Sequence, residues 1–134
     1  MKDENEKMKN KNDLLSRLLR FAVRIIILAS KLHKTPAGFA LANQIIRSGT
    51  SIGANCEEAQ DAFSRKDFLK TINISLKEAK ETRYWLKVIK LSGFLSASSI
   101  NPELQECNEI TAILITSIKT IKNKQGLSSN KNEK

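Results

Sequence analysis

The chain has 134 residues, 40% of them apolar, with five Gly and two Pro, which suits one compact domain. The apolar run that Arg24 and Lys31 bracket is shorter than the ~18 residues of a membrane span. The first twelve residues lack the apolar core of a signal peptide, so we expect a soluble cytoplasmic protein with no membrane partner. Cys56 and Cys107 are too few for a disulfide framework and lack metal-ligand spacing.

Positive charge is the most unusual property of the composition. Lys and Arg number 23 against 14 Asp and Glu, a net charge of +9. Residues 13–34 carry five bases and one acid, and residues 64–94 carry eight and three, whereas residues 35–63 set Arg47 against three acids. A basic domain attracts polyanions, of which nucleic acid is the commonest in a cell. The charge favours nucleic acid as a partner but is also consistent with solubility alone.

Apolar residues recur every three or four positions, which predicts an all-α protein. Short connections between the predicted helices indicate an antiparallel up-down-up-down four-helix bundle over residues 13–125. The polar segments 1–12 and 126–134 are expected to be disordered.

The helix ends are predicted from capping residues. Asn12 or Asp13 can cap a first helix that runs to about Lys34. Thr35-Pro36 combines a hydroxyl cap with Pro at the first helical position, which predicts a second helix to residues 62–63.

Capping residues also predict where two further helices start. Ser64-Arg-Lys-Asp67 resembles a capping box, so a third helix should begin there and end near Gly93. Asn101-Pro102 predicts a fourth helix that stops near Lys124, with Gly126 beyond it.

The first helix is apolar over about twice the ~100° arc that one bundle face needs. Leu14, Leu18, Phe21, Ile25, Leu28 and Leu32 form the expected core stripe. Apolar residues outside the core stripes of the first and third helices then predict an interface between copies of the chain. That predicted oligomer interface comprises Val23, Ile27, Ile74, Trp85 and Val88. A helix sunk deep in its own bundle would also explain the wide arc.

The run Gly49-Thr-Ser-Ile-Gly-Ala54 places small residues in the middle of the second helix. It lacks the Lys-Ser or Lys-Thr that completes a phosphate-binding loop. Close approach of a neighbouring helix is therefore the favoured interpretation.

The sequence offers little for catalysis, and we expect no enzyme activity and no cofactor. His33 is the single histidine and is expected to be solvated at a helix end. No residues provide a metal site, and both cysteines are expected in the core. Glu57, Glu58 and Asp61 form an acidic corner without a companion nucleophile, so ion pairing is expected there.

Two rows of bases each keep to one helix face, and they are the candidate nucleic-acid-binding residues: Arg17, Arg20, Arg24 and Lys31 on the first helix, and Lys80, Arg83, Lys87 and Lys90 on the third. Tyr84 and Trp85 could stack on exposed bases, although Trp85 is favoured as an interface anchor. Alternatively, both rows pair with Glu78, Glu81 or the acidic corner of a neighbouring subunit. Structural ion pairs are expected among Arg47, Glu58, Glu78 and Glu81.

Three stretches resemble a known bacterial family: Ser48-Gly-Thr-Ser-Ile-Gly-Ala-Asn-Cys-Glu-Glu-Ala-Gln60, Ser64-Arg-Lys-Asp-Phe68 and Leu76-Lys-Glu-Ala-Lys-Glu-Thr-Arg-Tyr-Trp-Leu86. They are similar to the four helix bundle proteins, also called 23S rRNA intervening-sequence or S23-like proteins, over residues 14–122. The matching motif residues are Arg47, Ser51, Asn55, Glu58, Asp67, Phe68, Glu78, Glu81 and Trp85.

The resemblance implies an antiparallel four-helix bundle that assembles as a ring, expected to be a homopentamer, with no established catalytic residues. A related member pairs with a reverse transcriptase and binds nucleic acid through its basic surface. Where many members have Ala-Glu-Gly, this chain has Glu57-Glu58-Ala59. From sequence we therefore expect a non-enzymatic oligomer that binds RNA or a ribonucleoprotein. The alternative is a protein–protein scaffold or accessory subunit without nucleic-acid contact.

Overall fold

The computed structural model describes the backbone of residues 4–132 and the side chains of residues 13–124. This part of the chain contains helices and no strand, so the all-α prediction is confirmed. The four helices are α1 (Glu4–Ser30), α2 (Pro36–Ala59), α3 (Arg65–Ser92) and α4 (Ala97–Asn132).

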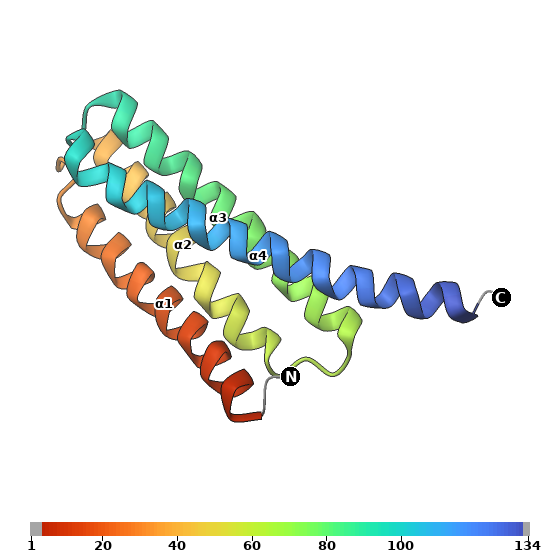
Figure 1. The fold of residues 1–134 in the computed structure, drawn as a ribbon. Helices are drawn as coiled ribbons and strands as arrows, with labels where there is room; N and C mark the ends of the chain where they lie inside the picture. The colour runs from red at the N-terminus through yellow and green to blue at the C-terminus, as the bar shows by residue number, and fades with distance from the viewer. Residues whose placement is uncertain (1–3, 133–134) are drawn as a thin grey trace.

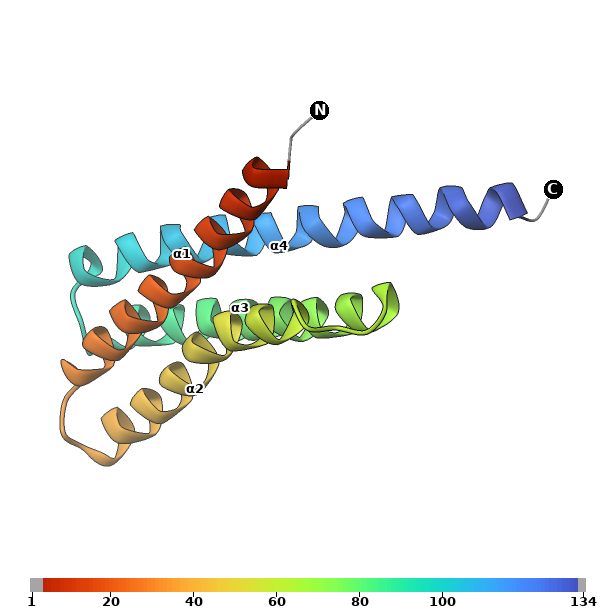
Figure 2. The ribbon, with the colours of Figure 1, turned by 90° about the horizontal axis from the view of Figure 1, so that it is seen from below.

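Helices that follow one another in the chain pack against each other, α1 on α2, α2 on α3 and α3 on α4. The α1–α2 and α3–α4 connections lie at one end of the molecule and the α2–α3 connection lies at the other (Figure 1). Helices α1 and α4 make the least contact of the packed pairs. Figure 2 shows the reason, because α1 crosses α4 at an angle instead of following it. The seam between α1 and α4 therefore has to be bridged by long side chains.

Three of the predicted caps are confirmed. Thr35 Oγ1 accepts a hydrogen bond from the Gly38 amide at 3.1 Å and caps α2, with Pro36 in the first helical position. Ser64 Oγ accepts from the Asp67 amide at 3.1 Å and caps α3. Gly93 ends α3 with φ of +77°, a left-handed conformation that favours glycine.

Helix α1 differs from the prediction at both ends. It begins at Glu4 instead of Asn12 or Asp13, because the preceding Glu, Lys and Asn residues contain no Pro or Gly that would stop a helix. It ends at Ser30, four residues before Lys34. The reason is that the amide of Lys31 donates to the Leu28 carbonyl, which tightens the last turn.

Helix α2 ends at Ala59, earlier than the predicted residues 62–63. The amides of Gln60 and Asp61 donate to the carbonyls of Glu57 and Glu58, three residues back, so the last turn tightens and the helix stops.

Helix α4 begins at Ala97 and ends at Asn132, not at Asn101 and Lys124. The Ser96 carbonyl accepts from the amides of Ser99 and Ile100, which starts the helix before Pro102. Pro102 and Gly126 both fall inside α4, so neither marks an end. The side chains of residues 1–12 and 125–134, for which we expected disorder, lie outside the described part, as does the backbone of residues 1–3 and 133–134.

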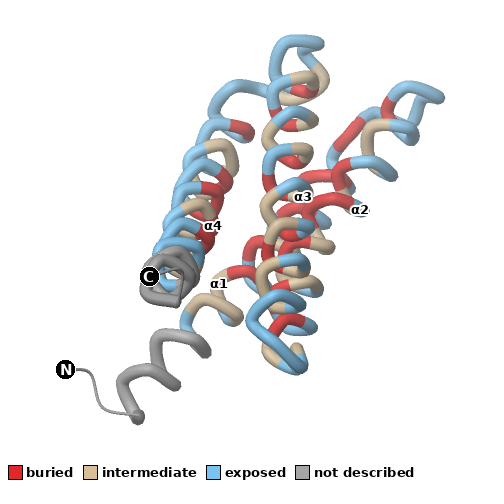
Figure 3. Tube along the Cα trace, turned by 90° about the vertical axis from the view of Figure 1, so that its right-hand side faces the viewer, coloured by how far each residue is buried: buried red, intermediate tan, exposed pale blue. Residues whose placement is uncertain are grey.

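The core lies between the helices, on the sides that face one another (Figure 3). The predicted α1 stripe is buried from Leu18 to Leu32, and Leu14 is half-buried. Cys56 and Cys107 are both buried, as predicted, with Cys56 Sγ 3.2 Å from the Ser75 hydroxyl. Burial raises the pKa of both thiols, that of Cys107 to about 11.

The small residues of α2 allow α1 to approach closely. A Cβ atom at Gly49 would lie 2.8 Å from Ile25 Cγ2, and one at Gly53 would lie 3.2 Å from Leu18 Cβ. The interpretation of this run as a packing feature is confirmed.

Candidate nucleic-acid interface

The basic row on α3 faces solvent beside α4. Lys80, Lys87 and Lys90 are exposed and Arg83 is half-buried, at spacings of three and four residues that keep them on one side of the helix. Within the described side chains, no ion pair joins any of the four to a carboxylate. The charge of this face is therefore not neutralised.

Amide side chains of α4 contact this row. Lys90 Nζ donates to Asn101 Oδ1 at 2.8 Å, and Arg83 Nη1 donates to Asn108 Oδ1 at 3.4 Å. A neutral amide orients a cation without cancelling its charge. The α3 face thus presents four cations, two of which, Arg83 and Lys90, are held by neutral amides.

The opposite arrangement holds on α1, where Arg17 meets carboxylates of α4. Arg17 Nη2 donates to Glu106 Oε1 at 2.6 Å and Nε donates to Oε2 at 2.8 Å, a two-bond contact. Glu109 Oε1 lies 3.5 Å from the same guanidinium. The hydrogen bond from Arg17 holds the pKa of Glu106 below its usual range, and Glu106 raises the pKa of Arg17 in turn.

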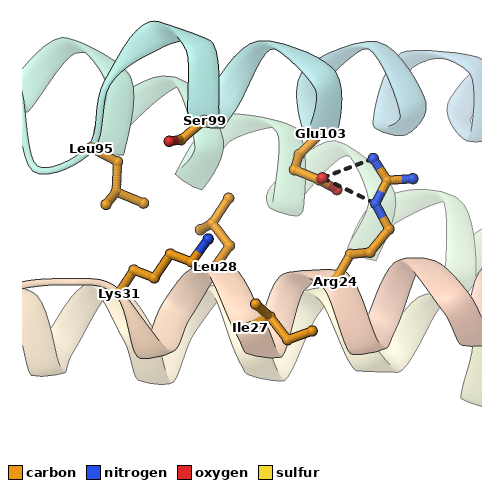
Figure 4. Close-up of a pocket in the computed structure, with 7 residues that line it drawn as sticks. All are labelled: Arg24, Ile27, Leu28, Lys31, Leu95, Ser99 and Glu103. Atoms are coloured by element: carbon orange, nitrogen blue, oxygen red, sulfur yellow. Dashed lines mark hydrogen bonds and ion pairs between the residues drawn. The ribbon is translucent and has the colours of Figure 1, made fainter.

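Arg24 makes the second bridge across this seam (Figure 4). Its Nε and Nη2 donate to Glu103 Oε1 at 3.0 and 2.8 Å. Glu103 Oε2 is buried and has no hydrogen-bond partner among the described residues. The pair lies at one end of a hollow of about 160 Å³ between α1 and α4, which Lys31 also lines.

The acids of α4 that face α1 are spaced three residues apart, which places them on one side of the helix. They are Glu103, Glu106 and Glu109. Sequence reasoning missed them as partners of Arg17 and Arg24. The signal was present, because acids at this spacing form a row that suits a basic helix beside it. Arg20 and Lys31 have no ion pair within the described part of the chain.

Arg47 of α2 lies against both acids of α3 that were assigned to structural ion pairs. Its Nη1 is 3.1 Å from Glu78 Oε2, and its Nη2 pairs with Glu81 Oε1. The hydrogen bond from Arg47 lowers the pKa of Glu81, and Trp85 Nε1 donates to the same carboxylate at 3.2 Å. Glu58 is not in this cluster; it lines a hollow at the α2–α3 corner.

Trp85 and Tyr84 lie side by side on α3. Their ring centroids are 5.1 Å apart and the rings meet edge to face, with an interplanar angle of 72°. Trp85 is half-buried, and its indole nitrogen bonds within the chain, whereas Tyr84 is 59% exposed. Of the other predicted interface residues, Val23, Ile27 and Ile74 are exposed and Val88 is half-buried.

Apolar surface is concentrated between α1 and α2. Leu19, Val23 and Ile26 of α1 line a groove of about 300 Å³ whose other wall is α2, around Gly53 and Ala54. The bundle therefore leaves part of the wide apolar arc of α1 uncovered.

The remaining candidates from the sequence are His33, the acidic corner and a metal site. His33 is exposed, with its ring centroid 5.2 Å from that of Phe94. Glu57, Glu58 and Asp61 form no ion pair in the described part of the chain. No group of His, Cys, Asp or Glu among the described residues could hold a metal ion.

A family model for the 23S rRNA-intervening sequence protein matches residues 10–116. The chain belongs to this family. A similar solved structure is the crystal structure of a protein of unknown function from the S23 ribosomal protein family of Bacteroides thetaiotaomicron. The two are 42% identical, with 79% of this chain and 98% of that one covered and a TM-score of 0.75.

Among curated proteins, no match was found. A search of the described helices found none that is long and apolar enough to cross a membrane. The family assignment agrees with the resemblance carried by the Ser48–Gln60 and Leu76–Leu86 motifs.

Proposed function

We propose that this member of the 23S rRNA-intervening sequence protein family is a non-enzymatic module that binds RNA, as part of a ribonucleoprotein in the cytoplasm. The observation that carries the proposal is the α3 face, where no ion pair to a carboxylate is formed by Lys80, Arg83, Lys87 or Lys90 within the described side chains, and Arg83 and Lys90 bond to neutral amides of α4. Cations that are not neutralised within the protein are available for phosphates. The family description, which refers to 23S rRNA, points to the same ligand.

The ion pairs on α1 reduce the number of candidate phosphate-binding residues. Arg17 and Arg24 are engaged by Glu106 and Glu103, so binding a phosphate there would first require breaking an ion pair. We therefore assign phosphate contact to the four α3 bases and a bridging role to these two arginines.

Titration of a fluorescent RNA at several salt concentrations tests the proposal. Four phosphate contacts to a single strand predict a slope of log K against log salt of about −3. An affinity that does not change with salt would exclude binding through phosphates.

We further propose that the helices run antiparallel in up-down-up-down order and that copies of the chain assemble into a ring, with a homopentamer expected. The exposed apolar groove on α1 and α2 supports self-association. A second exposed apolar site, Phe63 and Ile74 at the α2–α3 corner, lies on a different surface. Contact between two different surfaces is head-to-tail, and such contacts form a ring when the rotation between successive copies closes.

Light scattering at low and high salt tests the assembly. A mass several times 15.0 kDa that persists in high salt supports an apolar interface. A monomer at both salt concentrations would exclude the ring.

The second candidate function is a protein–protein scaffold or accessory subunit, for example to a reverse transcriptase, without nucleic-acid contact. The α1–α2 groove favours it, because an apolar groove suits a protein partner better than a phosphate chain. Changing Lys80, Lys87 and Lys90 to Gln separates the two functions. Loss of RNA affinity with intact assembly supports the RNA-binding module, whereas loss of assembly with intact RNA affinity supports the scaffold.

A further inference from the structure

We infer that Tyr84 is a stacking platform for an unpaired base and that the ligand of the α3 face is single-stranded RNA. The inference rests on the proposed function and specifies which form of RNA that site takes. It depends on the position of Tyr84, on what holds its ring, and on its difference from the other exposed aromatic residues.

Tyr84 lies at the edge of the basic row of α3, next to Lys80 and Lys87. Lys80 precedes it by four residues and Lys87 follows it by three, so one exposed ammonium group lies a helical turn to either side of the ring. The tyrosine ring is 59% exposed. A strand whose phosphates reach both lysines would therefore pass over the ring.

The ring of Tyr84 is supported by a series of contacts that begins on α2. Arg47 pairs with Glu81, which accepts the indole N–H of Trp85 at 3.2 Å. Trp85 then meets Tyr84 edge to face at a centroid separation of 5.1 Å. A ring held in one orientation loses little conformational freedom when a base stacks on it. These contacts support the ring while it stays 59% exposed, and a supported, accessible ring is what a stacking platform requires.

The other exposed aromatic residues of the described chain differ in their neighbours. Phe63 is fully exposed but lines a hollow in which three carboxylates, of Glu58, Asp61 and Asp67, outnumber one base, Lys70, so its surroundings disfavour a phosphate. Phe39 lines an apolar groove beside α1. Among the aromatic side chains that are more than half exposed, Tyr84 is thus the one with cations on both sides.

The preference for single-stranded over duplex RNA follows from how a base stacks on an aromatic ring. In a duplex each base is already stacked and paired, so an aromatic side chain on a helix surface cannot reach a base face. In a single strand the bases can turn out and stack on aromatic rings. The lysines alone would bind single-stranded and duplex RNA alike, and Tyr84 adds affinity for the single strand.

The test compares a fluorescent single-stranded RNA of 12 nucleotides with the same strand annealed to its complement, using the full chain. Tyr84→Ala is expected to weaken single-strand binding by about 5- to 100-fold and duplex binding by less than about 2-fold. Its salt slope should equal that of the unmodified protein, because no phosphate contact is removed. Tyr84→Phe, which keeps the ring, should retain the affinity.

Phe63→Ala is the matched control, because it removes an aromatic side chain that is even more exposed and lines a hollow with three carboxylates against one base. It should leave both affinities unchanged. Trp85, the only tryptophan, supplies a second measurement: single-stranded RNA should change its emission through Tyr84, and duplex RNA should not.

The outcomes separate this inference from the proposed function. If Lys80→Gln weakens RNA binding while Tyr84→Ala has no effect on the single strand, the stacking platform is overturned and the phosphate-binding face stands. Equal losses for single strand and duplex on Tyr84→Ala would also overturn it. If the unmodified chain binds neither RNA, the proposed function fails and this inference fails with it.

Discussion

Helices α1 and α3 carry basic rows of the same size, yet they meet different surfaces of α4. Arg17 and Arg24 of α1 face carboxylates, and Arg83 and Lys90 of α3 face amides. Two bases of the first row, Arg17 and Arg24, are engaged in holding α1 to α4, whereas no base of the second row is paired with a carboxylate within the described side chains. The number of bases on a helix therefore does not define a binding surface; the residues on the neighbouring helix do.

The largest effect is expected when the positive charges of α3 are removed, because this face is the one assigned to RNA binding. Changing Lys80, Lys87 and Lys90 to Gln should lower RNA affinity on the order of 100-fold near 0.1 M salt and reduce the salt slope by about 2. The physical reason is the loss of counterion release at three phosphates. Fluorescence anisotropy at several salt concentrations measures both quantities.

The matched control for that triple variant is Arg17→Gln with Arg24→Gln, which removes bases from α1. Its RNA affinity should stay within about 2-fold of the unmodified protein. A loss as large as that of the α3 variant would show that the two faces are equivalent and would contradict the comparison.

The single change Arg17→Gln should instead lower stability. Glu106 is only 16% exposed, so removing its partner leaves a carboxylate with little water around it. We expect the free energy of unfolding to fall by about 1–3 kcal/mol. Urea denaturation measures the change, and Glu106→Gln in the same chain should recover part of it. No loss of stability would mean that the seam is not held by this pair.

Acid should loosen the contact between α1 and α4. Arg17 holds the pKa of Glu106 below its unfolded value, so the pair stabilises the protein above the usual carboxyl range, and this contribution is lost as pH falls through the lowered pKa. Stability measured from about pH 6 to pH 3 should decrease more steeply in the unmodified protein than in Arg17→Gln. Parallel curves would indicate that Glu106 does not contribute.

The smallest expected effect concerns Cys107, which is buried on the side of α4 that faces the core. Burial raises the pKa of Cys107 to about 11, so the thiol remains protonated and unreactive in the folded state. This contribution to stability is present below the ordinary thiol pKa and is lost as pH rises toward 11. At neutral pH, a thiol reagent should label both cysteines of the folded protein far more slowly than in denaturant. Rapid labelling of the folded protein would contradict their burial.

The sequence predicts the helical class and the caps well, because these depend on neighbouring residues. Thr35-Pro36, Ser64 and Gly93 act where the local pattern places them. Ends set by weaker signals are less predictable: Asn101-Pro102 looked like a start, but the Ser96 carbonyl begins the helix earlier. Extension at the outer ends was missed because polar residues with no strong breaker fit either a helix or a disordered segment.

The candidate site was only partly predictable. Periodicity identifies which bases share a helix face, and it did so for α1 and α3 alike. It does not say which side of α4 each face meets, since that depends on how the helices are arranged in three dimensions. The crossing of α1 over α4 brings Glu103 and Glu106 to Arg24 and Arg17, and no local pattern encodes that crossing.

The angled seam between α1 and α4 has a consequence for how the molecule opens. Helix α1 is locked to α2 by the close fit at Gly49 and Gly53, whereas its link to α4 depends on charged groups near solvent. Charged links weaken in salt and acid while a close apolar fit does not. The contact between α1 and α4 is therefore the part of the bundle that opens first, and backbone amides of α4 beside Glu103 should exchange their hydrogens earlier than those packed on α3.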